Sequence, residues 1–186
     1  MTRPMPGGRR RVDAVLDPTF VVGLTDLSVD EIRRRRREAE QEEADLSYVR
    51  RMLHGRMDLI RAEIERRSQG SSVDLVSRLS EILADPQRTT HGAGRHITTQ
   101  PSRVDEHRRR VEQAIGDVAT SDVSARTDDE LTQSLIDLQT YEVEVSEVRR
   151  DVQRVADLFA DELTRRYRDG LVSVDDVLAR AAQPPR

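Results

Sequence analysis

Apolar residues recur every three or four positions along two long stretches of the chain, 28–68 and 127–169. This spacing places them on one face of an α-helix, whose turn holds 3.6 residues. We therefore expect two long helices of about forty residues, each ~60 Å long. The first apolar seam consists of Leu46, Val49, Leu53, Met57, Ile60 and Ile64. The second consists of Leu131, Leu135, Leu138, Val145, Val148, Val152, Phe159 and Leu163.

Capping signals bound both predicted helices. Ser28 with Glu31, and Thr127 with Glu130, have the spacing of a capping box. Glycines follow the last periodic residues at 70 and 170, where a left-handed residue commonly ends a helix. The narrow seams favour an antiparallel coiled-coil pair, in which one chain buries both seams. A parallel pair stays open, because the connection is long enough to span either way.

Shorter elements are expected around the two long helices. A flexible tail is predicted before the first of them, and an apolar patch at its end (Phe20, Val21, Val22 and Leu24) is expected to pack on that helix rather than dock a partner. Short helices are predicted at 72–84, 103–117 and 174–182. The predicted divisions are a tail at 1–26, helical segments at 27–85 and 127–186, and a linker with an intervening helix at 86–126. The expected fold is all-α, one helical domain overall.

The two halves superpose at an offset of 99 residues. Ser28 then falls on Thr127, and Leu53 falls on Val152. Caps and apolar seam agree at this single offset. The pattern indicates an internal duplication of a long helix followed by a short one.

A row of polar residues runs beside each seam, in steps of four, three, four and four residues. In the second helix the row is Glu142, Ser146, Arg149, Gln153 and Asp157. In the first it is Glu43, Ser47, Arg50, His54 and Asp58. Each row is a stripe along one helix face. Two matching stripes, one per long helix, indicate a binding site that is built twice.

The residue types in the rows suit recognition better than catalysis. Arginine offers a planar fork that fits phosphate oxygens or the O6 and N7 edge of guanine. A carboxylate accepts from the N1–H and amino group of guanine. Two antiparallel copies would generate a pseudo-twofold axis, and cyclic di-GMP is a ligand with that symmetry. A solvated face held by i,i+4 ion pairs is the alternative, and duplication would copy such a face as well.

The doubled spacing Glu-x3-Ser-x2-Arg-x3-Gln-x3-Asp resembles the signature of the RsiG-like cyclic-di-GMP-dependent anti-sigma factors of actinobacteria. The resemblance covers residues 28–69 and 127–169. The second copy matches at all five positions, and the first departs only at His54, where the pattern has Gln. A neutral His can still donate one hydrogen bond and accept one, so His54 stays among the expected ligand residues.

The resemblance implies a non-catalytic regulator with an antiparallel coiled-coil fold. It implies that all ten row residues bind cyclic di-GMP, as two molecules. With ligand bound, such a protein would sequester a flagellar, WhiG-type sigma factor that drives sporulation genes.

Composition narrows the remaining function classes. The chain has 186 residues, of which 35% are charged and 35% hydrophobic, with no Trp and no Cys. Without Cys, disulfides, thiolate catalysis and Cys-based zinc sites are excluded. The histidines at 91, 96 and 107 lack metal-ligand spacing, so we expect neither a metal nor an enzyme. No signal peptide or membrane span is found, which predicts a cytoplasmic protein without membrane contact.

Two other functions remain as alternatives. A coiled-coil protein–protein adaptor without a nucleotide ligand would explain the rows as solvated charge. A DNA-binding regulator could use the arginine runs at 33–37 and 108–110, but the net charge of −4 and the lack of a helix-turn-helix pattern disfavour it. The run at 33–37 is mainly expected as a solvated face; contact with an acidic partner or guidance of an anionic ligand is the other possibility.

Overall fold

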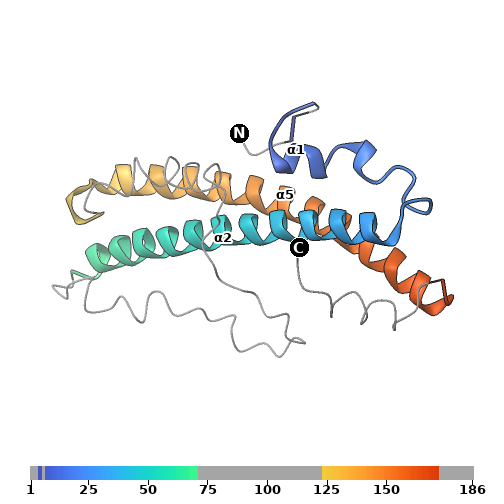
Figure 1. Cartoon of the computed structure of the whole chain (residues 1–186). Helices are drawn as coiled ribbons and strands as arrows, with labels where there is room; N and C mark the ends of the chain where they lie inside the picture. Colours follow the sequence, from blue (N-terminus) through green and yellow to red (C-terminus); the bar gives the residue numbers. More distant parts are fainter. Residues whose placement is uncertain (1–3, 6, 71–122, 172–186) are drawn as a thin grey trace, which may run out of the picture. The chain divides into compact units, whose positions relative to one another are not determined.

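The computed structural model describes residues 4–5, 7–70 and 123–171. In these ranges every regular element is helical, and the two long helices α2 and α5 pack against each other (Figure 1). The all-α prediction is confirmed. The elements are α1 (Arg11–Val15), the 3₁₀ helix η1 (Pro18–Phe20), α2 (Val29–Ser68), the 3₁₀ helix η4 (Val123–Ala125) and α5 (Asp128–Arg168). The predicted helices at 72–84, 103–117 and 174–182, and the histidines at 91, 96 and 107, lie outside the described residues.

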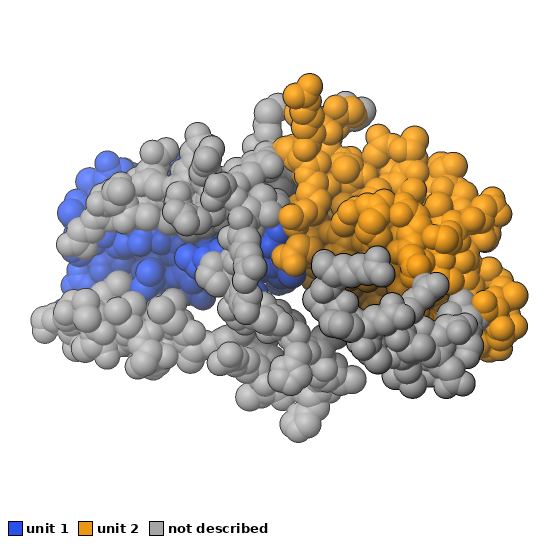
Figure 2. Space-filling view, in the orientation of Figure 1, with its two compact units in different colours: residues 1–2, 44–147 blue, residues 3–43, 148–186 orange. Residues whose placement is uncertain are grey.

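The chain divides into two compact units (Figure 2), and each long helix contributes one part to either unit. Of the described residues, unit 1 holds 44–70 and 123–147, and unit 2 holds 4–5, 7–43 and 148–171. In unit 1, Arg67 pairs with Asp128 and Arg50 pairs with Glu142. Later residues of α2 therefore contact earlier residues of α5. Contacts in unit 2 follow the same order. The helix segments are antiparallel in each unit, as predicted.

The ends of the long helices follow the predicted signals. Ser28 Oγ accepts from the Glu31 backbone N–H at 3.2 Å. Thr127 and Glu130 form a complete capping box, with bonds of 2.8 and 3.3 Å in the two directions. Gly170 has φ +69°, and the bonds around it form a Schellman motif that satisfies the last carbonyls of α5.

The predicted seams form the core of both units. Unit 1 buries Leu46, Val49, Leu53, Met57, Ile60, Leu131, Leu138 and Val145, together with Val123. Unit 2 buries Val12, Val15, Ile32, Ala39, Val148, Val152, Ala156, Phe159 and Leu163. The prediction that Ile64 and Leu135 belong to the buried seams is only partly correct, because both are half-buried. Their neighbours Glu63 and Ser134 are buried instead.

The apolar patch that precedes α2 packs as predicted. Ile32, Phe159 and Leu163 form a buried cluster, and Phe20, Val21, Leu24 and Leu27 are among the apolar side chains that pack on it. The rings of Phe20 and Phe159 meet edge to face, with centroids 5.6 Å apart and planes at 85°. Val22, by contrast, is exposed.

The prediction of a flexible tail over residues 1–26 is wrong for much of that range. Val12 and Val15 on α1 are buried, and Arg11 Nη1 lies 3.9 Å from the fully buried Glu42 of α2. Asp13 accepts from the Met5 backbone N–H at 2.8 Å and from Arg10 Nε at 2.6 Å. These few contacts hold the segment in place, although its Pro-, Gly- and Arg-rich composition is typical of a tail.

An arginine clamp closes one end of each unit. In unit 2, Arg166 donates to the backbone carbonyls of Leu27 and Thr25 at 2.7 and 2.8 Å, and to that of Leu24 at 3.2 Å. Glu162 orients Arg166 by accepting from its Nε at 2.7 Å. The clamp fixes the loop that enters α2.

The same clamp occurs in unit 1, at positions that correspond at the 99-residue offset. Arg67 donates to the carbonyls of Ser124 and Val123 at 3.1 and 3.4 Å, and its Nε bonds Glu63 at 2.7 Å. Arg67 also pairs with Asp128 at 2.7 Å, at the start of α5. The duplication inferred from the sequence therefore extends to matching side-chain contacts.

None of the helices in the described ranges is long and apolar enough to cross a bilayer.

Candidate functional site

Four of the predicted site residues meet in unit 1, around one carboxylate oxygen of Glu142. Its Oε1 accepts from Arg50 Nε at 3.0 Å and from Ser146 Oγ at 2.7 Å. His54 Nε2 lies 3.1 Å from the same oxygen, on the side of α2 that faces α5. Glu142 and Ser146 project from α5, and Arg50 and His54 from α2. We call this set the Glu142 cluster.

The Glu142 carboxyl is held in its charged form. Burial acts to raise its pKa, because the side chain is only 17% exposed. Hydrogen bonds from Ser146, His54 and Arg50 outweigh that effect, and the pKa of Glu142 is lowered from its ordinary value. The cluster therefore presents a carboxylate and a guanidinium side by side at neutral pH.

A second cluster lies in unit 2, around Arg149. Arg149 Nη1 donates to Glu43 Oε1 at 2.9 Å, across from α5 to α2. The same Nη1 donates to Gln153 Oε1 at 3.2 Å, one turn further along α5. The Arg149 and Glu43 side chains are mostly buried, at 19% and 29% exposed. We call this set the Arg149 cluster.

The two clusters contain equivalent residues of the two repeats. At the 99-residue offset, Arg50 corresponds to Arg149 and Glu142 to Glu43. Each cluster thus pairs the arginine of one row with the glutamate of the other row, within its own unit. His54 and its counterpart Gln153 differ in partner, since His54 bonds the glutamate and Gln153 bonds the arginine.

The other three predicted residues lie on the same two helices. Asp58 accepts from Arg61 Nη1 at 2.8 Å and is 41% exposed. Ser47 on α2 and Asp157 on α5 are half-buried on their helices. The hydrogen bonds described above join seven of the ten row residues in two clusters.

The pairing between rows was not foreseen from the sequence. The rows were interpreted as stripes along single helices, so the partner of each arginine stayed unnamed. The antiparallel helices in the observed register place residue 50 opposite 142 and residue 43 opposite 149. Only the register itself, which depends on the packed seams, selects these partners.

Paired Arg and Glu side chains can read a guanine nucleotide. The guanidinium fits phosphate oxygens or the guanine edge, and the carboxylate accepts from guanine N–H groups. No group of three His, Cys, Asp or Glu side chains that could hold a metal ion occurs among the described residues.

A family model described as RsiG-like matches two segments of the chain, 19–83 and 117–182. The chain belongs to the RsiG-like family. The two matched segments begin and end about 99 residues apart, in agreement with the internal duplication. RsiG-like proteins are regulators, which indicates an anti-sigma factor role, and they are not a known enzyme family. No curated protein was found to match the chain.

Proposed function

We propose that the chain is an anti-sigma factor controlled by cyclic di-GMP. The nucleotide is recognised by the Glu142 and Arg149 clusters, with Ser47, Asp58 and Asp157 beside them. The loaded protein sequesters a flagellar, WhiG-type sigma factor and blocks transcription of sporulation genes. As a sigma factor antagonist it acts in the cytoplasm, without contacting DNA or a membrane.

One observation carries this proposal. The same Arg–Glu pair, bridging α2 and α5, occurs once in each unit, and its residues lie in the two segments that match the RsiG-like family. A solvated charged face would not require the arginine of each row to meet the glutamate of the other. A ligand with twofold symmetry needs equivalent groups supplied twice, and the duplication provides them.

The Glu142 cluster retains groups for a nucleotide. All three of its hydrogen bonds end on Oε1, so Oε2 of Glu142 remains as an acceptor for guanine N–H groups. Arg50 bonds Glu142 through Nε, and its Nη groups make no bond to the described residues. In this proposal those Nη groups donate to a phosphate or to O6 and N7 of guanine.

Ligand control follows from differential affinity. A dianionic nucleotide neutralises the arginines of both clusters and orders their side chains. The conformation that the sigma factor binds is then more populated, so the nucleotide increases the affinity for the sigma factor. By thermodynamic linkage, the sigma factor increases the affinity for the nucleotide by the same factor.

Calorimetric titration of the purified protein with cyclic di-GMP tests the proposal. We expect saturable binding, and capture of a WhiG-type sigma factor that depends on added nucleotide. A protein that takes up no cyclic di-GMP, with or without the sigma factor, would rule the proposal out. Cyclic di-AMP serves as the control, because adenine lacks the O6 acceptor and the N1–H donor of guanine.

A ligand-independent coiled-coil adaptor is the second candidate. It is favoured by the fact that Arg50 and Arg149 are already paired with carboxylates, as they would be in ion pairs that only link two helices. Equal partner capture with and without cyclic di-GMP would select this function.

A further inference from the structure

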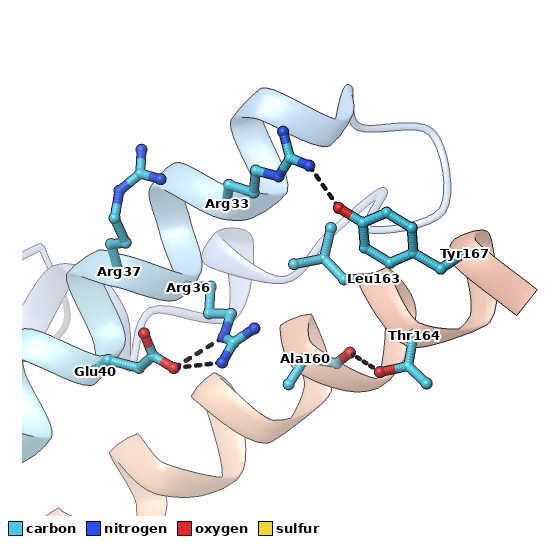
Figure 3. Close-up of a pocket in the computed structure, with 8 residues that line it drawn as sticks. All are labelled: Arg33, Arg36, Arg37, Glu40, Ala160, Leu163, Thr164 and Tyr167. Carbon is cyan, nitrogen blue, oxygen red and sulfur yellow. Dashed lines mark hydrogen bonds and ion pairs between the residues drawn. The ribbon is translucent and has the colours of Figure 1, made fainter. Parts of the chain in front are cut away.

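A cationic pocket lies in unit 2, and none of its lining residues belongs to the Glu142 cluster or the Arg149 cluster. Its volume is about 420 Å³, and it is open to solvent. It is lined by Arg33, Arg36, Arg37 and Glu40 of α2 and by Ala160, Leu163, Thr164 and Tyr167 of α5 (Figure 3). Three arginines and one carboxylate line it, in a chain whose net charge is −4. The pocket is therefore a local positive site on an acidic protein.

The arginines of the pocket differ in how far they are engaged. Arg36 pairs with Glu40 at 2.8 Å. Arg33 Nη2 donates to Tyr167 Oη at 2.5 Å, across from α2 to α5, and lies 3.6 Å from Asp30 (Figure 3). Arg37 is exposed and forms no ion pair with the described residues. A bound carboxylate could thus be met by Arg37 and by the hydroxyl hydrogen of Tyr167 without breaking the Arg36–Glu40 pair.

The pocket also has an apolar side. Ala160 and Leu163 line it beside Thr164, whose hydroxyl is already used in a bond to the Ala160 carbonyl at 2.9 Å. Charged and apolar walls in one open pocket suit a segment that carries both acidic and apolar side chains.

The arginines that line the pocket are not repeated at the equivalent positions of unit 1. Positions 33, 36 and 37 correspond to Thr132, Leu135 and Ile136 in the second repeat. Across from them, Thr164 and Tyr167 correspond to Glu65 and Ser68. The equivalent positions in unit 1 therefore lack the arginines, and they have Glu65 in place of Thr164 but Gln139 in place of Glu40. A twofold ligand would call for the same groups in both repeats, whereas a protein partner without that symmetry would not.

We propose that this pocket docks an acidic, partly apolar segment of a protein partner. The identity of that partner rests on the proposed function, under which it is the sequestered sigma factor. The carboxylates of the segment bind Arg37 and the Tyr167 hydroxyl, and its apolar side chains pack on Leu163 and Ala160. Cyclic di-GMP binds elsewhere, so ligand binding and partner docking are separable.

Charge reversal at Arg37 tests the inference. Arg37→Glu leaves the described contacts of α2 intact, so helicity should not change. Arg154→Glu is the matched control: it makes the same change in net charge in unit 2, on an arginine whose side chain is 76% exposed and does not line the pocket. We expect Arg37→Glu to weaken capture of the sigma factor by the cyclic-di-GMP-loaded protein roughly tenfold or more. Calorimetric binding of cyclic di-GMP should stay unchanged in both variants.

A second probe keeps the test independent of the sigma factor. A fluorescein-labelled peptide of glutamate and leucine residues is titrated into wild type and both variants. Binding by wild type that Arg37→Glu loses and Arg154→Glu keeps would support the pocket, even if the sigma factor is not captured and the proposed function fails. Equal loss in both variants, or no difference from wild type with either probe, would overturn the inference. Unchanged sigma factor capture by Arg37→Glu would overturn it while leaving the proposed function intact.

Discussion

Each arginine of the polar rows lies at an ion pair between helices rather than on a solvated face. Arg149 is the better position for a single substitution, because Nη1 joins Glu43 and Gln153 and most of the side chain is buried. Its neighbour Arg150 is exposed and offers a matched control.

Replacing Arg149 by Ala should strongly weaken cyclic di-GMP binding while leaving the helices formed. Loss of charge-assisted hydrogen bonds costs about 1.5–3 kcal/mol, which corresponds to roughly 10- to 100-fold in affinity. Calorimetry measures the binding, and circular dichroism measures the helix content. Arg150→Ala should bind as wild type does. If Arg149→Ala binds cyclic di-GMP as tightly as wild type does, Arg149 does not contribute to the site.

His54 is the one place where the rows depart from the family signature. Its Nε2 bonds Glu142 at 3.1 Å, a contact that a glutamine amide can also make. We expect His54→Gln to keep nucleotide affinity within about threefold, a difference below about 1 kcal/mol. His54→Ala should weaken it more, since the hydrogen bond is lost. If both variants bind as tightly as wild type, the His54 side chain does not contribute.

At the scale of helices and loops, the arginine clamps explain how the ends of each unit are fastened. Arg166 is only 9% exposed and holds three backbone carbonyls of the loop before α2. Its neighbour Arg165 pairs with Glu162 and Asp169 nearer the surface and is 40% exposed. The clamp thus depends on one of two adjacent arginines.

Replacing Arg166 by Met should destabilise the protein by about 2–3 kcal/mol, because carbonyls of a partly buried loop lose their donor. Arg165→Met should cost less than about 1 kcal/mol, as expected for a surface ion pair. Urea denaturation followed by circular dichroism compares the two. Equal losses would mean that the carbonyl contacts of Arg166 contribute little.

The glutamates of the two clamps, Glu63 and Glu162, also affect the stability of the protein in acid. The guanidiniums of Arg66 and Arg67 lower the pKa of Glu63 to about 2 against the opposing effect of burial. Arg165 and Arg166 lower that of Glu162 to about 2. Since the folded-state pKa lies below the ordinary value of 4.5, the stabilisation is complete above pH ~4.5 and is lost as the pH falls towards 2.

Glu162→Gln should therefore flatten the decrease of unfolding free energy between pH 4.5 and 2. The same substitution at the exposed Glu147 should leave that decrease unchanged. Urea midpoints measured at intervals of pH provide the comparison. A Glu162→Gln protein with the acid profile of wild type would exclude this carboxylate as a source of the pH dependence.

Helix type and helix ends were predictable because their causes are local. Ser28, Thr127 and the terminal glycines act within one turn, and the seams follow the 3.6-residue period. What escaped prediction depends on which side chains pair in the folded protein. Glu63 is buried where the period favours Ile64, because two arginines neutralise its charge. The segment around α1 is ordered by Arg11 reaching Glu42 and by two valines, which composition alone does not indicate.

On the scale of the whole chain, the duplication separates what is repeated from what is not. The caps, the clamps and the Arg–Glu pairs recur at the 99-residue offset, whereas the cationic pocket occurs in unit 2 and is replaced by other residue types at the equivalent positions of unit 1. The repeated features suit a twofold nucleotide, and the single one suits an asymmetric protein.

This separation predicts equal importance for the two repeats in nucleotide binding. Arg50→Ala and Arg149→Ala should weaken cyclic di-GMP binding to a similar extent, within roughly threefold of each other, because each removes the arginine of an equivalent Arg–Glu pair. Calorimetric titration of the two variants side by side measures the ratio. If only Arg149→Ala lost affinity, the copy with His54 would have ceased to bind ligand, and the twofold interpretation of the rows would be wrong.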